Sequence, residues 1–259
     1  MRIATFNCNS IRQRLPQLLE WLAANQPDLL ALQETKVADE LFPADAICAA
    51  GWHVAFRGQK AYNGVAMITR ALPESASFGL QDGDGDESAP RLADVRLGPV
   101  RVLNTYIPNG QAPDSPKYTF KLDWYARLRR YLDQRYDPAR EPLIWLGDLN
   151  VAPTPDDVYD SPRLWGDVCH CQATTDAFQQ VCAWGLTDVF RRHLPGPGHY
   201  TFWDYRDIRA QDRGLGWRID HILAPPALAA RSTRLWVDTA ARRAEKPSDH
   251  TFVVADFEL

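Results

Sequence analysis

Cysteine is scarce in this sequence, whose 259 residues include five, an odd number scattered along the chain. A disulfide framework needs a denser and even set, so we interpret the cysteines as reduced thiols. The segment Cys169-His170-Cys171 also lacks the ligand spacing of a zinc site. These observations exclude a small protein held together by disulfides.

Long apolar runs are missing as well. No stretch approaches the ~18 consecutive apolar residues that a membrane span requires. The first residues enter an amphipathic strand without the apolar core of a signal peptide. We therefore expect a cytoplasmic protein that is not attached to a membrane.

An excess of positive charge is absent too. The chain has 29 Lys and Arg against 33 Asp and Glu, which gives a net charge of -4. This balance excludes a protein that coats nucleic acid through general basicity, so any nucleic-acid site must be a local patch.

Several catalytic motifs are also lacking, namely a glycine-rich phosphate loop, a GxSxG elbow and an HExxH helix. The segment from Asp82 to Asp86 imitates the start of a calcium loop. However, Glu87 stands where that loop needs glycine, and Ala93 stands where it needs its closing glutamate. We interpret this segment as a solvated acidic turn.

The composition that remains is typical of a globular α/β protein, with 45% hydrophobic and 24% charged residues. Short apolar or alternating runs predict strands at residues 2–8, 28–33, 54–57, 64–70, 91–97, 100–107, 143–146, 200–204, 217–223, 232–237 and 252–257. A first helix follows Pro16. We find no repeat and no linker, so we expect residues 1–259 to form a single domain.

Residues 115–136 have the spacing of an amphipathic helix, with Phe120, Trp124, Leu128 and Leu132 on one side. The rest of this helix carries five positive residues, Lys117, Lys121, Arg127, Arg129 and Arg130. We favour a solvated helix face, and a contact with nucleic-acid phosphates is the alternative.

Polar residues stand at the ends of successive apolar strands. They are Asn7, Glu34, Tyr106, Asp148 with Asn150, and Asp249 with His250. Asp220 is flanked by apolar residues, so we expect it to be buried with a partner, for which His250 is the natural candidate. Singly, each residue has an ordinary structural explanation. Together they supply oxygen ligands for a hard divalent cation, a His–Asp pair and a phenol, which favours Mg²⁺-assisted phosphoryl chemistry.

At these residues the sequence is similar to exonuclease III, the bacterial branch of the apurinic/apyrimidinic endonuclease family within the endonuclease/exonuclease/phosphatase superfamily. The motifs that carry the resemblance are FNCNSIR, LQETK, NGVAMITR, NTYIPNG, GDLNVAP, YTFWDYR, GWRIDHIL and KPSDH. They run in family order from residue 6 to residue 250. LQETK, GDLN and SDH are specific for the superfamily, and the others narrow the resemblance to DNA repair.

The resemblance implies a four-layered α/β sandwich, in which two mixed, mostly antiparallel sheets pack face to face with helices outside. It implies a Mg²⁺-dependent phosphodiesterase holding one or two ions, with Mn²⁺ able to substitute. We expect a monomer, because the sequence has no oligomerisation signal. Its substrate would be double-stranded DNA, incised 5′ to abasic sites or trimmed at 3′ ends as a 3′-5′ exonuclease and 3′-phosphatase. Water would attack in line and leave a 3′-hydroxyl.

The resemblance also implies roles for individual residues. The metal-binding set would be Asn7, Glu34, Asp148, Asn150, Asp249 and His250, with Glu34 as the principal ligand. Asp148 would activate the attacking water and Asn150 would hold it. His250, kept cationic by Asp220, would contact the scissile phosphate, and Tyr106 would donate to it or act as a phenolate. Asn9 stands where the animal branch has aspartate, which suggests a less charged metal site.

Phe202, Trp203 and Trp217 are either core aromatics or the apolar wall of a pocket for a base-free sugar. In the family, positions that match Phe202 and Trp217 form that wall. We also assign Arg218 to DNA or abasic-pocket contact. Between residues 191 and 218, six Arg against three Asp could follow DNA phosphates.

Two other functions stay open. One is a superfamily phosphodiesterase or phosphatase that acts on an inositol phosphate or a lipid, which the lack of membrane features disfavours. The other is a nucleic-acid-binding regulator without catalysis, which the intact carboxylate set disfavours.

Overall fold

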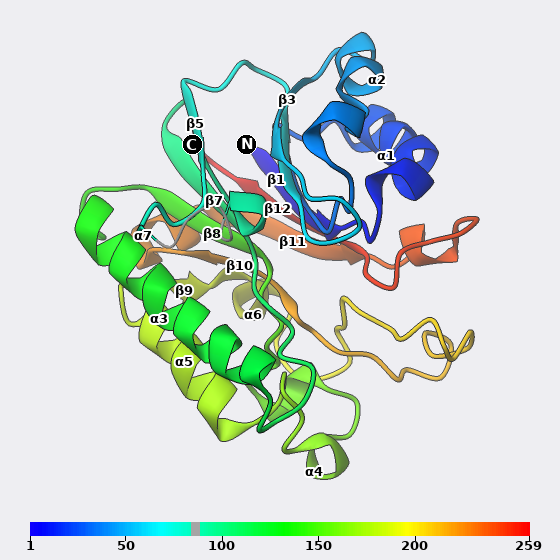
Figure 1. Ribbon diagram of the computed structural model, residues 1–259, viewed down its shortest axis with the longest axis vertical. Helices are drawn as coiled ribbons and strands as arrows, with labels where there is room; N and C mark the ends of the chain where they lie inside the picture. The colour runs from blue at the N-terminus through cyan, green and yellow to red at the C-terminus, as the bar shows by residue number, and fades with distance from the viewer. Residues whose placement is uncertain (84–88) are drawn as a thin grey trace.

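The computed structural model describes residues 1–83 and 89–259, and its strands form two sheets of six (Figure 1). The first sheet has the order β11-β12-β1-β2-β4-β3. Its strands are β1 (Arg2–Asn7), β2 (Leu29–Gln33), β3 (His53–Arg57), β4 (Val65–Thr69), β11 (Ser232–Asp238) and β12 (Phe252–Phe257). Among these strands β1 and β2 run parallel, and the other neighbours are antiparallel.

The second sheet has the order β5-β6-β7-β8-β10-β9. Its strands are β5 (Ser75–Phe78), β6 (Leu92–Leu97), β7 (Val100–Tyr106), β8 (Leu143–Asp148), β9 (Thr187–Asp188) and β10 (Asp220–Ala224). Here β7 and β8 form the parallel pair among the described strands. The prediction of two mixed, mostly antiparallel sheets is confirmed.

The inner faces of the two sheets pack against each other and form the central core. Along β1, Ile3 belongs to this inner core, whereas Ala4 and Phe6 belong to the cluster on the outer face. This alternation follows from the two-residue period of a strand. The same period places Asn7 on the inner side, at the carboxyl end of β1.

The inner core becomes polar next to that end. The side-chain amide of Gln33, at the end of β2, donates to Asn104 Oδ1 in the opposite sheet at 2.7 Å. Asn104 donates back to the carbonyl oxygen of Leu32 at 2.9 Å. All three residues are fully buried. These hydrogen bonds therefore fix the position of one sheet relative to the other near the ends of β1 and β2.

Helices cover the two outer faces and complete the four layers (Figure 1). On the first sheet these are α1 (Ile11–Asn25) and α2 (Ala44–Ala49), and on the second α3 (Pro116–Arg135) and α5 (Gln172–Cys182). Short helices α4 (Ser161–Leu164), α6 (Val189–His193) and α7 (Pro226–Ala229) lie in the connections, with single turns η1 (Asp39–Leu41), η3 (Pro155–Asp157) and η4 (Ala241–Arg243). None of the described helices has the length and apolarity needed to cross a bilayer.

The α3 helix begins as its sequence predicts. Ser115 caps it by accepting a hydrogen bond from the Tyr118 N–H at 3.1 Å, and Pro116 occupies the first helical position. The prediction of a solvated positive face is wrong at two residues. Lys121 is completely buried and Arg127 is 5% exposed, the latter pairing with Asp82.

Three further differences from the predicted elements have simple causes. Residues 200–204 form no strand, because Phe202 makes only isolated bridges to Trp217 and His250. The β10 strand begins at Asp220 rather than at residue 217. The strands β5 and β9 were not predicted, since they are short and lack an apolar alternation. The acidic turn predicted from Asp82 to Asp86 lies mostly outside the described residues.

Candidate active site

The candidate site lies where the parallel pairs of both sheets end. In the first sheet Asn7 pairs with Gln33, and Glu34 follows directly. In the second sheet Tyr106 pairs with Asp148, and Asp148 also pairs with Asp220 at the start of β10. Carboxyl ends of parallel strands present side chains at one edge of a sheet, which is why both sheets direct polar groups to the same place.

Local backbone geometry explains parts of the motifs. Glu34 and Asn150 both have left-handed conformations, with φ of 51° and 49°. Such conformations are uncommon outside glycine and concentrate at functional sites. Gly147 of the GDLN motif has φ 133°, and a Cβ there would lie 2.1 Å from the Thr105 carbonyl oxygen. Glycine is therefore required for β8 to approach β7 at this point.

Two carboxylates meet across the sheet boundary. The Asn7 amide nitrogen donates to Glu34 Oε1 and to Asp148 Oδ2, each at 2.8 Å. Ligand atoms of Glu34, Asp148 and His250 all lie within 4.8 Å of one another. The structure thus brings together three residues of the predicted metal-binding set, with Asn7 between two of them.

His250 stands between two buried aspartates. Its Nδ1 lies 2.8 Å from Asp220 Oδ2, and its Nε2 lies 3.8 Å from Asp148 Oδ2. Burial alone would lower the pKa of His250, but the carboxylates of Asp220 and Asp148 outweigh it and raise that pKa to about 10. The imidazole is therefore cationic at neutral pH. Asp220 is held in turn by the Thr201 hydroxyl, which donates to its Oδ2 at 2.6 Å.

Burial and the neighbouring carboxylates also change the pKa values of Asp148 and Tyr106. Burial raises the pKa of Asp148 to about 7; the nearby His250 lowers it, and Asp220 and Glu34 add to the rise. Burial also raises the pKa of the Tyr106 hydroxyl, with further contributions from Glu34 and Asp148. Tyr106 is consequently a protonated donor in this environment, which argues against the phenolate alternative.

The donor set fits a hard divalent cation. Glu34 and Asp148 offer half-buried and buried oxygens, and their ligand atoms lie within 4.8 Å of each other and of His250. Lys36 lies 2.7 Å from Glu34 Oε2 and supplies one positive charge. The Asn7 Oδ1 atom accepts from the Asn9 N–H at 3.0 Å, so Asn7 would present oxygen to a cation only after its amide rotates.

Two predicted ligands stand apart from this group. The side chain of Asn150 is engaged by Asn109, which donates to its Oδ1 at 3.0 Å, and by the Ile107 carbonyl, to which it donates at 2.9 Å. Asp249 accepts from the Asn9 side chain at 2.9 Å. Both line the same cavity as the three clustered residues.

That cavity has a volume of about 390 Å³ and one apolar wall. The backbones of Phe202 and Trp217 exchange two hydrogen bonds of 2.9 Å, which hold the two side chains together at the wall. The Phe202 ring lies 4.9 Å from the His250 ring. Trp203 is 4% exposed and packs in a separate apolar cluster, so it is a core residue.

Sequence reasoning missed several residues that line this cavity. They are Asn109, Asp167, Cys169, Asp204, Arg206 and Ile219. Of these, Asn109 belongs to the same NTYIPNG motif as Tyr106, so this motif could have identified it. Asp204 and Ile219 lie in runs that were predicted as strands without a functional role, and Asp167, Cys169 and Arg206 come from irregular segments.

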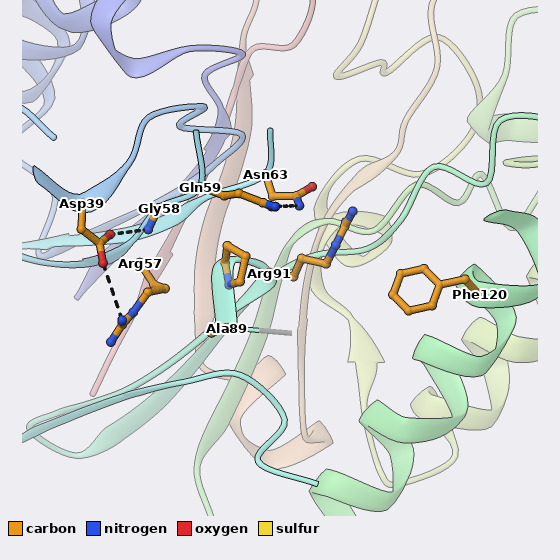
Figure 2. Close-up of a pocket in the computed structure, with 9 residues that line it drawn as sticks. Asp39, Arg57, Gly58, Gln59, Asn63, Ala89, Arg91 and Phe120 are labelled. Atoms are coloured by element: carbon orange, nitrogen blue, oxygen red, sulfur yellow. Dashed lines mark hydrogen bonds and ion pairs between the residues drawn. The ribbon is translucent and has the colours of Figure 1, made fainter. Parts of the chain in front are cut away.

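A larger cavity, of about 580 Å³ (Figure 2), shares no lining residue with the cavity of the candidate site. Arg57, Asn63 and Arg91 line it, and Phe120 of α3 lies across from them. It contains no carboxylate cluster comparable to the candidate site among the described residues. Arg91 connects the two regions, since its guanidinium lies 4.9 Å from the centre of the Tyr106 ring.

The prediction that Arg218 contacts DNA is wrong. The Arg218 side chain is completely buried, with Nε 2.6 Å from Asp157 and Nη1 2.8 Å from Asp188. Arg218 follows Trp217 in the sequence, which suggested that both line the pocket. The Arg218 side chain instead lies against Asp157 and Asp188, and it does not line that cavity. The excess of positive charge predicted for residues 191–218 is smaller than the sequence count, because Arg191 and Arg218 bind aspartates that lie outside this segment.

The profile of the Endonuclease/Exonuclease/phosphatase family matches residues 4–250, and the chain therefore belongs to this family. The exodeoxyribonuclease III of Haemophilus influenzae is 32% identical to it over the whole length of both proteins. The predicted resemblance to the bacterial branch is confirmed by this relative.

Solved structures agree with these relationships. An AP endonuclease from Archaeoglobus fulgidus is 44% identical, with a TM-score of 0.96 and complete coverage of both chains. A 3′ phosphatase from Neisseria, solved with a product DNA hairpin, is 40% identical, with a TM-score of 0.94 and the same coverage. The predicted fold is confirmed by this similarity.

Proposed function

We propose that this protein is a metal-dependent DNA-repair phosphodiesterase that incises duplex DNA 5′ to abasic sites and removes nucleotides or blocking groups from 3′ ends. The observation that carries the proposal is the cluster of Glu34, Asp148 and His250 at the ends of two packed sheets. The proposal is supported by similarity along the whole chain to an exodeoxyribonuclease III and an AP endonuclease.

His250 and Tyr106 would bind the scissile phosphate. The cationic imidazole presents Nε2 toward the cavity, because its Nδ1 is occupied by Asp220. A fixed positive charge in a buried site stabilises the additional negative charge of the phosphoryl transition state. Tyr106 would donate its hydroxyl proton to the same phosphate, in keeping with its raised pKa.

Asp148 would accept a proton from the attacking water. Without a bound cation, burial raises the pKa of this carboxyl to about 7, and a cation beside it would lower that pKa and keep it ionised as a proton acceptor. The Asn150 N–H donates to Asp148 Oδ1 at 3.0 Å and orients the carboxylate. Asn150 would also help to hold the water in line with the phosphorus.

Glu34 and Asp148, with Asn7 after rotation of its amide, would hold Mg²⁺, and Asp249 lies where it could assist. The bound ion would act as a Lewis acid on the phosphate oxygens and stabilise the oxyanion leaving group, and Mn²⁺ would replace it. The hard oxygen ligands and the absence of a thiolate in the group support this choice.

The wall formed by Phe202 and Trp217 would accept a deoxyribose without its base. The Phe202 ring lies 4.9 Å from the His250 ring, so this wall adjoins the proposed phosphate site. We also propose that the protein works as a monomer and that residues 1–259 form one domain, because one core cluster takes side chains from Ile3 to Phe257.

The experiment uses a labelled duplex with one synthetic abasic site and an intact duplex with recessed 3′ ends, each with Mg²⁺ or with EDTA. We expect incision 5′ to the abasic site that EDTA abolishes, and metal-dependent shortening of the intact duplex. Failure to cleave either substrate with Mg²⁺ or Mn²⁺ would refute the proposal.

A second candidate is an enzyme whose main activity is 3′-phosphatase. It is favoured by the 3′ phosphatase from Neisseria, which is similar over the complete chain. A duplex with a 3′-terminal phosphate distinguishes the two. Release of phosphate at a rate far above abasic incision would establish the second candidate, and the reverse order would establish the first.

A further inference from the structure

Four consecutive backbone carbonyl groups directly after β8 each accept a hydrogen bond from a different buried side chain. The pairs are Tyr125 with Leu149, Lys121 with Asn150, His221 with Val151, and His170 with Ala152. A carbonyl oxygen can only accept, so each of these side chains is the donor. We call residues 149–152 the active-site loop, because Asn150 and Asp148 line the catalytic cavity.

Lys121 makes the most extensive of these contacts. Its Nζ donates to the carbonyl oxygens of Asn150 at 2.7 Å, Val168 at 2.6 Å and Asn109 at 3.1 Å. Those residues belong to three separate loops. The side chain is completely buried, and in residues 1–83 and 89–259 no carboxylate forms an ion pair with it. A buried ammonium is expensive unless its donors are satisfied, and here three carbonyls satisfy them.

The contacts lead from Lys121 directly to the catalytic groups. Asn109 and Asn150, whose backbones it holds, are joined to each other by a side-chain hydrogen bond of 3.0 Å. The Asn150 N–H in turn orients Asp148 at 3.0 Å. Asn150 has a left-handed backbone, which persists only where the surroundings hold it.

We propose that Lys121 is a positioning residue for phosphodiester cleavage. Its ammonium fixes the backbone of the active-site loop, and through Asn150 it fixes the direction of Asp148. The inference rests on the proposed function. It assigns Lys121 no contact with DNA, because the side chain is fully buried.

The first test replaces Lys121 with methionine, which keeps an unbranched apolar stem and removes all three hydrogen bonds. Two quantities are measured: the single-turnover cleavage rate at saturating abasic duplex with Mg²⁺, and the dissociation constant for that duplex in EDTA. A displacement of about 1 Å in a catalytic group can lower a rate about 100-fold. We therefore expect the rate to fall about 10- to 100-fold while the dissociation constant changes less than about threefold.

Two variants complete this test. Lys121→Gln keeps an amide that can donate to two of the carbonyls, so it should recover part of the rate, and it remains informative if the methionine variant does not fold. Arg140→Met removes one positive charge from an exposed side chain and should keep the wild-type rate. A rate loss matched by an equal loss of DNA affinity would overturn the inference, since it would indicate a direct DNA contact.

A double-mutant cycle tests the route to Asp148, which runs through the backbone of Asn150. If Lys121 acts by directing that carboxylate, Lys121→Met combined with Asp148→Asn should cleave no more slowly than Asp148→Asn alone. Independent effects that multiply would overturn the inference. A wild-type protein without any nuclease activity would instead refute the proposed function, whereas an active wild type with an equally active Lys121→Met variant would refute only the positioning role.

Discussion

Replacement of Asp220 by asparagine removes the carboxylate nearest to the His250 imidazole while keeping its shape. The pKa of His250 rises from 6.5 to about 10, which corresponds to about 5 kcal/mol in favour of the protonated form. Asp220 makes the largest favourable contribution, ahead of Asp148 and Asp249. Assigning roughly half of the total to Asp220 gives a loss of about 2–3 kcal/mol in the variant.

If this charge stabilises the transition state to the same extent, the loss lowers turnover about 30- to 150-fold at neutral pH. The pH dependence has a definite sign. Because the folded-state pKa of His250 is raised, its stabilising contribution is fully present below pH 6.5 and disappears as the pH rises through about 10. In Asp220→Asn the disappearance should begin at lower pH, since the pKa falls back toward its ordinary value.

The assay is the rate of abasic incision at saturating DNA between pH 6 and 10, with the His250 ring titrated by NMR in the same variants. Thr201→Val is the matched control, because it removes a hydrogen bond to Asp220 and leaves the charge in place. Its alkaline limb should stay near that of the wild type. An Asp220→Asn variant with the wild-type alkaline limb would refute the electrostatic argument.

Three further predictions concern other groups. Asp148→Asn should lose most of its turnover, as measured by the single-turnover rate of abasic incision at saturating Mg²⁺, because the variant lacks the proposed proton acceptor. Glu34→Gln should need much more Mg²⁺ for half-maximal cleavage; an unchanged Mg²⁺ titration would remove Glu34 from the metal site. Arg218→Met should lower the free energy of unfolding by about 3–5 kcal/mol in urea at neutral pH and leave DNA affinity unchanged. Because Arg218 lowers the pKa of Asp157, this difference should shrink as the pH falls through the ordinary range of a carboxyl group.

Local sequence was sufficient to predict most of the strands and the composition of the site. Short apolar runs show where these strands end: Asn7 and Asp148 are the last residues of β1 and β8, and Glu34 directly follows β2. Their meeting follows from parallel pairing, which brings carboxyl ends together. The run at residues 200–204 has an apolar pattern as well, but lone bridges replace the ladder that a strand needs.

The buried cations could not be predicted in this way. The helical periodicity predicts that Lys121 faces solvent. Its acceptor Val168 lies 47 residues further along the chain. Arg218 binds Asp157, which is 61 residues away. Whether a charge is buried depends on partners that only the tertiary structure supplies, so periodicity places such residues on the surface by default.

The proposed catalytic and metal-binding groups are divided between the two sheets, with Asn7 and Glu34 on one and Tyr106, Asp148 and Asp220 on the other. The distances among them therefore measure how one sheet is placed on the other. The amide pair of Gln33 and Asn104 holds that placement a single residue before the site. A core substitution that shifts one sheet by a fraction of an ångström relative to the other would lower the catalytic rate without changing the fold. The catalytic rate of this protein should therefore depend sensitively on the packing between its two sheets.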